Sequence, residues 1–155
     1  MASEPIFQSS VAWNPSPPDT MVICCVDGRY LQQTQEFIAH HLGVGVHADL
    51  VAIPGGIEPL TLFDLVPKDF NFLRRRLEPV VHARGTRRII AIAHDDCLWY
   101  RNRKFGPVTI DLRARQRKDL QRAATQLREM FPKVAVETYF AHLDPASRSV
   151  SFEAV

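Results

Sequence analysis

Two short patterns in the sequence combine residue types that can bind a metal ion. Residues 25–29 read CVDGR and residues 94–97 read HDDC, so two cysteines and one histidine are available in a fixed order. Two thiolates and one imidazole form a soft donor set that suits Zn²⁺ in a tetrahedral site and leaves a fourth position for water or substrate. The patterns therefore predict a zinc site held by Cys25, His94 and Cys97, with the stoichiometry of a catalytic centre.

The elements that must position these residues follow from the hydrophobic pattern. Short apolar runs at 21–26, 50–53, 88–93 and 134–140 predict buried strands, and helical spacing predicts helices over 30–42, 70–84 and 112–130. Pro79 is expected to split the second helix or to mark a boundary, and residues 150–155 to return as an antiparallel hairpin strand. This alternation predicts an α/β fold with a mainly parallel central sheet flanked by helices.

The predicted site lies at the carboxyl ends of two strands. Cys25 ends the first predicted strand and His94 follows the third. Ligands of parallel α/β sheets bind at the carboxyl ends of strands, so the two residues meet if their strands are neighbours. Cys24 should point to the opposite face of its strand, which favours core packing for this cysteine.

Composition bounds the class of protein. A chain of 155 residues, 46% hydrophobic and 23% charged, is expected to form one domain over residues 20–155, preceded by an extended proline-rich arm at 1–19. The formal charge of +2 favours neither nucleic acid nor a membrane surface as a partner. We find no secretory signal and no apolar run long enough to cross a bilayer, and three cysteines suit a reducing cytoplasm.

The two patterns resemble those of the β-class carbonic anhydrases. In that family the cysteine of C-x-D-x-R and both ends of H-x-x-C bind zinc, and the aspartate and arginine form a dyad. Residues 48–56 (ADLVAIPGG) are similar to the family's second strand and glycine turn. Leu98 and Trp99 depart from the family, which usually has glycines after the last cysteine. The chain is also shorter than most members and lacks their long N-terminal helices.

The resemblance implies a function and a role for each residue. Hydroxide on a zinc ion bound by Cys25, His94 and Cys97 would attack carbon dioxide to give bicarbonate, as in a lyase of the carbonate dehydratase type. Asp27 would accept a hydrogen bond from this hydroxide while paired with Arg29. Backbone amides at Gly55 and Gly56 could position substrate. A homodimer or higher homo-oligomer is also implied.

Alternatives remain open at this stage. The same zinc site could hydrolyse carbon disulfide or carbonyl sulfide, or the chain could be a non-catalytic zinc-binding homologue. Buried cysteines can also pack in a core without any role. His40, His41 and His47 are candidate proton carriers by residue type alone. The basic residues of 101–118 are expected to form a solvated face rather than an anion or nucleic-acid site.

Overall fold

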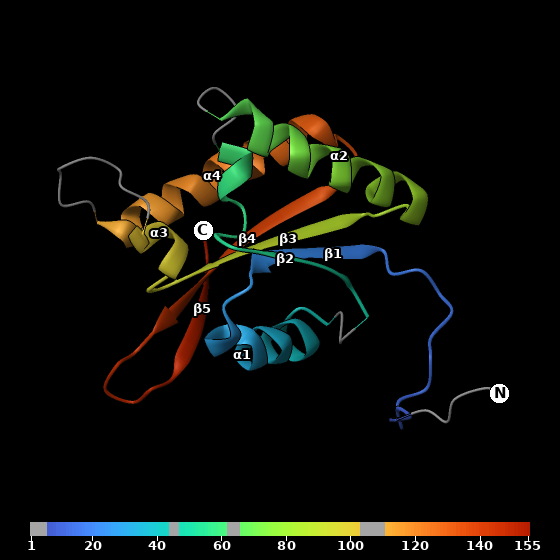
Figure 1. Ribbon diagram of the computed structural model, residues 1–155, viewed down its shortest axis with the longest axis horizontal. Coiled ribbons are helices and arrows are strands. Elements are labelled where there is room, and N and C mark those ends of the chain that lie inside the picture. The colour runs from blue at the N-terminus through green and yellow to red at the C-terminus, as the bar shows by residue number, and fades with distance from the viewer. Residues whose placement is uncertain (1–5, 44–46, 62–65, 103–110) are drawn as a thin grey trace.

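A five-stranded sheet forms the centre of the molecule (Figure 1). The computed structural model describes residues 6–43, 47–61, 66–102 and 111–155, and all statements below concern these ranges. The strands are β1 (Thr20–Cys25), β2 (Asp49–Ile53), β3 (Arg88–His94), β4 (Ala135–Leu143) and β5 (Val150–Ala154), in the order β2-β1-β3-β4-β5. The first four run parallel, and β5 pairs antiparallel with β4. This confirms the predicted α/β fold with its C-terminal hairpin strand.

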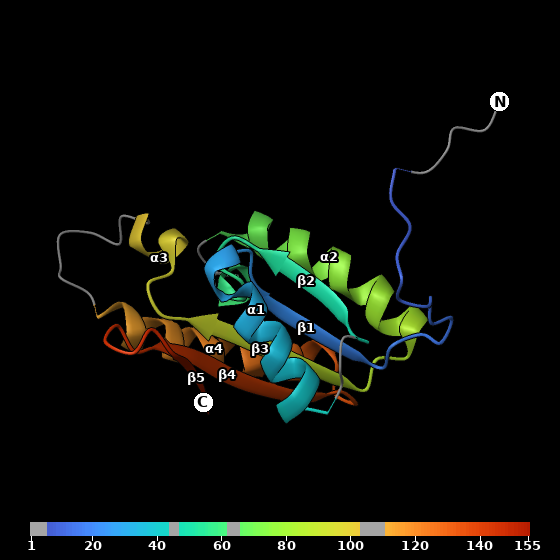
Figure 2. The same cartoon turned by 90° about the horizontal axis from the view of Figure 1, so that it is seen from below.

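Helices cover both faces of the sheet (Figures 1 and 2). Helices α2 (Pro67–Arg84) and α4 (Leu112–Met130) pack on one face, and α1 (Leu31–Glu36) lies on the other. The short helix α3 (Leu98–Asn102) follows β3. Two 3₁₀ turns, Gly28–Tyr30 and Glu58–Thr61, follow β1 and β2, so the chain leaves the carboxyl end of each strand through a tight turn.

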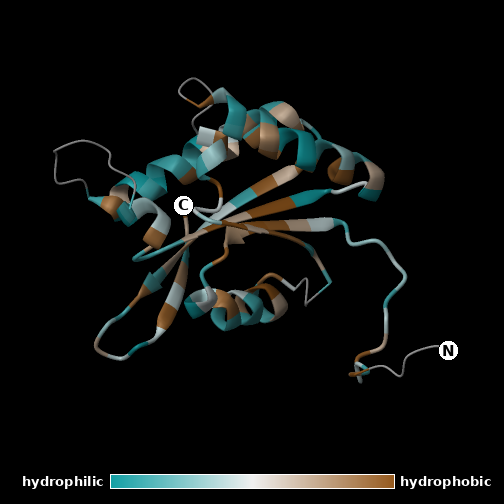
Figure 3. Ribbon diagram, viewed as in Figure 1, coloured by the Kyte–Doolittle hydropathy of each residue, from teal (hydrophilic) through white to brown (hydrophobic). Residues whose placement is uncertain are grey.

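Side chains of β1 alternate between two hydrophobic cores. Met21 and Ile23 are buried beneath α2 and α4, whereas Val22 and Cys24 are buried on the α1 side with Phe37. This alternation follows from the two-residue period of a strand. In Figure 3 the apolar colour is concentrated on the strands and on the helix surfaces that face them. Cys24 is therefore a core residue facing away from Cys25, as predicted, and burial raises the pKa of its thiol to about 11.

The helix predicted over 30–42 is less regular than expected. The chain forms the 3₁₀ turn Gly28–Tyr30, then α1, and ends in a π-helical turn, Phe37–His41, in which the Leu42 amide donates to the Phe37 carbonyl at 3.2 Å. The wider turn accompanies close packing of the Phe37 ring on Phe152 of β5, with ring centroids 4.2 Å apart. Periodicity alone does not predict such a bulge, because its position depends on this long-range contact.

Helix α2 starts three residues before the predicted position and continues through Pro79. Pro67 occupies the first turn, where the missing amide hydrogen of proline has no helical partner to lose. Pro79 and Arg75, the residue four positions earlier, are both exposed, so water can solvate the carbonyl that Pro79 leaves without a partner. Val80, three residues after the buried Leu77, is 37% exposed.

Residues 6–19 contain neither helix nor strand and expose the large side chains of Phe7 and Trp13. The described helices include none with the length and apolar composition required to cross a bilayer.

Helix α3, which the sequence pattern did not predict, is anchored by a buried carboxylate. The Tyr100 hydroxyl donates to Asp119 Oδ2 at 3.1 Å, and Arg115 Nε donates to the same oxygen at 3.0 Å. Asp119 is completely buried on the inward face of α4, which we expected to be apolar. Because α3 begins directly after Cys97, this contact fixes the segment that carries a predicted metal ligand.

We predict that Asp119→Ala lowers the free energy of unfolding by roughly 3 kcal/mol, because it leaves the buried Tyr100 hydroxyl and the Arg115 guanidinium without this acceptor. Urea unfolding measures the change. Asp119→Asn keeps one acceptor oxygen and should cost less than Asp119→Ala. Equal stability of Asp119→Ala and the unchanged protein would show that the buried carboxylate does not hold α3 to α4.

Candidate metal centre

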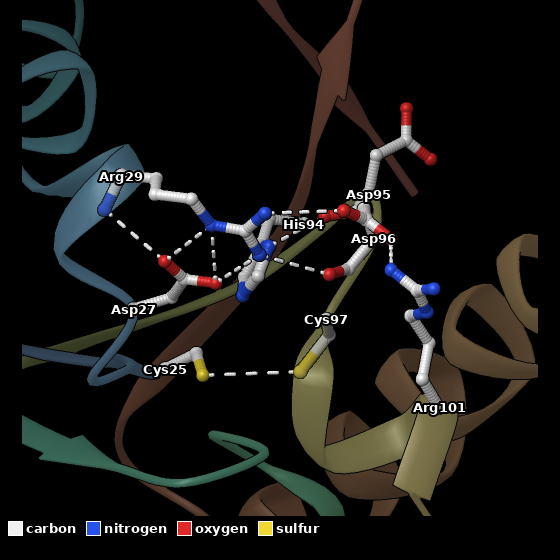
Figure 4. A network of polar contacts seen from close by, with 8 residues as sticks. All are labelled: Cys25, Asp27, Arg29, His94, Asp95, Asp96, Cys97 and Arg101. Atoms are coloured by element: carbon white, nitrogen blue, oxygen red, sulfur yellow. Dashed lines mark hydrogen bonds and ion pairs between the residues drawn. The ribbon is translucent and has the colours of Figure 1, made fainter.

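Parallel pairing of β1 with β3 brings the two sequence patterns together. Cys24 is paired with Ile92, so Cys25 and His94 lie at the same edge of the sheet, and a short turn after β3 returns Cys97 to this edge. The sulfur atoms of Cys25 and Cys97 are 3.8 Å apart (Figure 4). The potential ligand atoms of Cys25, His94 and Cys97 all lie within 4.8 Å of one another. The structure therefore places the three predicted ligands in one group that could hold a metal ion.

The His94 imidazole is oriented by the backbone. Its Nδ1 lies 2.7 Å from the Asp95 carbonyl oxygen, which can only accept, so Nδ1 carries the hydrogen. Nε2 then has its lone pair free. Within the described part of the chain, this buried nitrogen has no hydrogen-bond partner. A histidine fixed in this way by its other ring nitrogen is the usual arrangement of a metal ligand.

The Cys25 and Cys97 side chains form a hydrogen bond between their sulfur atoms. A hydrogen bond from Cys97 lowers the pKa of Cys25 to about 4, assisted by His94 and by the backbone amides of Asp27 and Gly55, and against the effect of burial. The same hydrogen bond and burial raise the pKa of Cys97. Cys25 is therefore held as the thiolate, the form in which cysteine binds metals.

The donor set fits Zn²⁺. Two sulfur atoms at about 2.3 Å from a tetrahedral zinc ion are about 3.8 Å apart, which matches the separation of the Cys25 and Cys97 sulfur atoms. The unpartnered Nε2 of His94 supplies the third donor. Three protein ligands leave one coordination position for a small molecule.

Asp27 and Arg29 form a bidentate ion pair beside this group. Arg29 Nε donates to Asp27 Oδ1 at 2.9 Å and Nη2 donates to Oδ2 at 2.6 Å. Asp27 also accepts a hydrogen bond from the Arg29 amide at 3.1 Å, which caps the 3₁₀ turn. Arg29 lowers the pKa of Asp27, so the carboxylate stays ionised and can act as a hydrogen-bond acceptor. The expected dyad is present, and its backbone is fixed as well as its side chains.

Asp95 and Asp96, between His94 and Cys97, are bound to arginines. Arg113 donates to both oxygens of Asp95 at 2.9 Å, and His142 Nδ1 lies 2.6 Å from Asp95 Oδ2. Asp96 accepts from Arg29 Nη1 at 3.1 Å and from Arg101 Nη1 at 2.6 Å (Figure 4). The turn that carries two potential ligands is thus held by ion pairs from three arginines.

The described part of the basic region is largely solvent-exposed, as expected, and also forms ion pairs. Arg101 and Arg113 each pair with a carboxylate of the turn 94–97, Arg115 with Asp119 and Arg117 with Glu153. Residues 103–110 of the basic region, with Arg103 and Lys104, lie outside the described residues.

The glycine turn shapes the site from the β2 side. Gly55 and Gly56 have φ of 76° and 59°, and a Cβ on Gly55 would lie 2.3 Å from Trp99 Cδ1. The Gly56 amide donates to the Ile53 carbonyl at 2.9 Å, and a hydrogen bond from the Gly55 amide helps to lower the pKa of the Cys25 thiol. Gly55 therefore makes room for Trp99 and supports Cys25, while substrate contact by either amide stays a prediction.

A small, mostly apolar cavity adjoins the group. It has a volume of about 90 Å³ and lies between the sheet and α1. Cys25, Asp27, His94 and Tyr30 line one side of it and contribute its ionisable groups. The Tyr30 ring packs 4.3 Å from the His94 ring, and its buried hydroxyl has no hydrogen-bond partner among the described residues. The remaining wall is largely aliphatic, from Val22, Leu31, Ile38, Ala48, Leu50 and Ile92.

A wider cavity of about 870 Å³ opens on the other side of Cys25 and Asp27. Leu98 and Trp99 line it, together with Arg29 and Arg101. Tyr100, the next residue along the chain, does not line this cavity and is buried against α4.

Sequence reasoning missed several residues of the site and left others untested. Nothing in the spacing distinguished Asp96, Arg101 or Tyr30 as neighbours of the metal ligands. Among the candidate proton carriers, His41 stacks on Phe37 with ring centroids 5.0 Å apart, and an exposed contact of 3.3 Å joins His47 to Asn14. A proton-carrying role for His40, His41 or His47 therefore stays a prediction.

Comparisons with known proteins agree on one family. A family model described as "Putative carbonic anhydrase" matches residues 18–151. None of the curated protein sequences compared with this chain matches it.

Solved structures of β-carbonic anhydrases share the fold. Isoform I from Trichomonas vaginalis has a TM-score of 0.59 at 16% identity, over 93% of this chain and 87% of that protein. The carbonic anhydrase from Streptococcus mutans has a TM-score of 0.58 at 16% identity, over 94% and 87%. A β-carbonic anhydrase from Sordaria macrospora, one of two described as tetrameric, has a TM-score of 0.53 at 13% identity, over 88% and 81%.

Identities this low establish the fold alone, whereas the family model covers most of the sequence. The chain therefore belongs to the carbonic anhydrase family described by that model, as a β-carbonic anhydrase-like member.

Proposed function

We propose that this protein is a zinc-dependent enzyme that hydrates carbon dioxide reversibly to bicarbonate. The observation that carries this proposal is the group of Cys25, His94 and Cys97, with its unpartnered His94 Nε2, next to the Asp27–Arg29 ion pair. Family membership and fold support the same reaction class.

The chain's own residues supply the metal ligands and the acceptor. Cys25, His94 and Cys97 would hold the ion, which when bound activates water at neutral pH by its Lewis acidity. Asp27 would accept a hydrogen bond from a water molecule at this site through a carboxylate oxygen and would orient it towards substrate. Arg29 keeps Asp27 ionised and fixes its position through two hydrogen bonds.

The aliphatic cavity suits an uncharged substrate. Carbon dioxide is apolar and small, and the walls from the sheet and α1 offer it a mostly aliphatic surface opposite the candidate ligands. The Tyr30 ring packs against the His94 ring from one side. Tyr30 therefore both lines the cavity and restrains the candidate ligand His94.

Carbon disulfide or carbonyl sulfide is a second candidate substrate. The observation in its favour is the apolar surface of Leu98 and Trp99 beside Cys25, where the family usually has glycines. Large apolar side chains at this position favour a polarisable, weakly hydrated substrate.

We also infer a homo-oligomer and a cytoplasmic location. Strand β2 is at an edge of the sheet, and Leu50 on it and Leu31 nearby are about half exposed, which favours burial against a second copy. The Sordaria macrospora relatives are described as tetrameric. Cys25 and Cys97 face each other as free thiols, which suits a reducing compartment.

Zinc binding is tested by removing single ligands. We expect stoichiometric zinc in the unchanged protein and far less in His94→Ala and Cys97→Ser, because each variant lacks one of three protein ligands. Elemental analysis after chelator-free purification measures the content. Cys24→Ser is the matched control and should keep its zinc, since Cys24 faces the opposite core. Full zinc in both ligand variants would refute the site.

The reaction is tested by stopped-flow carbon dioxide hydration near pH 7 and pH 8.5, on samples of known zinc content. Turnover that disappears in Cys97→Ser is the expected result. Release of hydrogen sulfide from carbon disulfide or carbonyl sulfide, measured in parallel, identifies the second candidate. Stoichiometric zinc without turnover of any of the three gases would leave a binding role and contradict the proposed enzyme.

The dyad is tested by Asp27→Asn. This variant keeps the shape of the side chain but loses the charged acceptor, so we expect unchanged zinc content and a decrease in kcat/KM of about 10- to 100-fold. Asp144→Asn, which alters a partly exposed loop carboxylate, is the control and should retain full activity. Full turnover by Asp27→Asn would exclude Asp27 from the mechanism.

A further inference from the structure

The Arg29 guanidinium is bound on two sides. On one side it donates to both Asp27 oxygens, from Nε at 2.9 Å and from Nη2 at 2.6 Å. On the other side Nη1 donates to Asp96 Oδ2 at 3.1 Å and Nη2 donates to the Asp96 carbonyl oxygen at 3.0 Å (Figure 4). All three nitrogen atoms are used, so the plane of the guanidinium is fixed.

Asp96 itself is held in an uncommon conformation. Its φ is 54°, in the left-handed region that few residues other than glycine, asparagine and aspartate adopt. Arg101 Nη1 donates to its second carboxylate oxygen at 2.6 Å. This backbone conformation presents both the carbonyl and the carboxylate of Asp96 to Arg29, and Asp96 lies in the turn that carries His94 and Cys97.

The second attachment matters because Arg29 is exposed. More than half of its side chain is accessible to water, where solvent screens its ion pair with Asp27. Asp27 lies beside a metal site with an open coordination position, and a carboxylate is itself a zinc ligand. Unless Arg29 is fixed, Asp27 is free to compete for that position.

We propose that Asp96 is a positioning residue, which holds Arg29 and thereby keeps Asp27 as a hydrogen-bond acceptor instead of a fourth metal ligand. The proposal rests on the metal site of the proposed function, but it does not depend on carbon dioxide as the substrate.

The test measures access to the open position, with Co²⁺ in place of zinc and azide as the probe. Visible absorption of the Co²⁺ protein reports azide binding. In Asp96→Asn, one of the two oxygens becomes an NH₂ group, so the side chain cannot accept from both arginines. We expect unchanged Co²⁺ stoichiometry and an apparent Kd for azide at least about threefold higher. Loss of a negative charge alone would strengthen azide binding, so this direction separates the two effects.

A double-mutant cycle with Asp27→Asn identifies the competitor. Because a carboxamide is a poor metal ligand, adding Asp96→Asn to Asp27→Asn should no longer raise the azide Kd, and only the lowering caused by the lost charge should remain. A rise in Kd that persists without the Asp27 carboxylate would mean that Asp96 acts by distorting the ligand turn, and would overturn the proposal. An unchanged Kd in the single variant would overturn it as well.

Two further variants complete the design. Asp96→Gly tolerates the positive φ and removes both carboxylate oxygens, so it should raise the Kd at least as much as Asp96→Asn, and it decides the question if Asp96→Asn folds poorly. Asp19→Asn removes another exposed ion pair, Asp19–Arg87 at 2.6 Å, and should have no effect on azide binding.

Failure of the metal site and failure of the proposed substrate give different results in these experiments. No Co²⁺ binding by the unchanged protein would refute the metal site and this proposal together. Normal Co²⁺ and azide binding without carbon dioxide turnover would refute only the substrate.

Discussion

Side-by-side parallel pairing of β1 and β3 is the constraint on which the site depends. Both strands must end at the same end of the sheet for Cys25 and His94 to approach, and in the observed register Cys25 is level with Ala93, one residue before His94. The register is fixed by burial, since residues of β1 alternate between two apolar cores and none can change sides without exposing one of them. Burial of the hydrophobic cores thus provides the free energy that brings the donor atoms together. Without it their approach is unfavourable, because thiolates repel each other and polar groups lose their hydration on burial.

The arginines around the site compensate an excess of carboxylates. Asp27, Asp95 and Asp96 lie within a few residues of the ligands, and each is paired with at least one guanidinium. Burial raises the pKa of Asp95, but hydrogen bonds from Arg113, the Leu143 amide and His142 lower it further. These carboxylates therefore stay ionised, and their hydrogen bonds are directed to arginines. This leaves the sulfur and nitrogen donors as the groups available to a soft metal ion.

Much of the fold and part of the site could be predicted from the sequence because the signals are local. Apolar runs predicted all five strands, and Asp111, whose side chain accepts from the amides of Arg113 and Ala114, marks the start of the correctly predicted helix α4. The three candidate ligands could be proposed from the sequence because C-x-D-x-R and H-x-x-C each stand at the end of a predicted strand, and the structure brings their donor atoms into one group. Asp96, Arg101 and Tyr30 could not, because their roles come from contacts between segments far apart in the chain, and from a positive φ that no spacing reveals. The π-helical turn after α1 and the buried Asp119 depend on tertiary contacts in the same way.

Gly55 and Trp99 show how this chain accommodates its departure from the family pattern. A bulky residue two positions after Cys97 needs space, and the absent side chain of Gly55 provides it, since a Cβ there would overlap the indole ring. The same glycine adopts a positive φ and directs its amide towards the Cys25 sulfur. One position thus meets three requirements: the turn after β2, the packing of Trp99 and the stabilisation of a thiolate. The shape of the wide cavity and the environment of Cys25 are consequently coupled through this turn, because any side chain that displaced Trp99 from the cavity would also disturb a donor to Cys25.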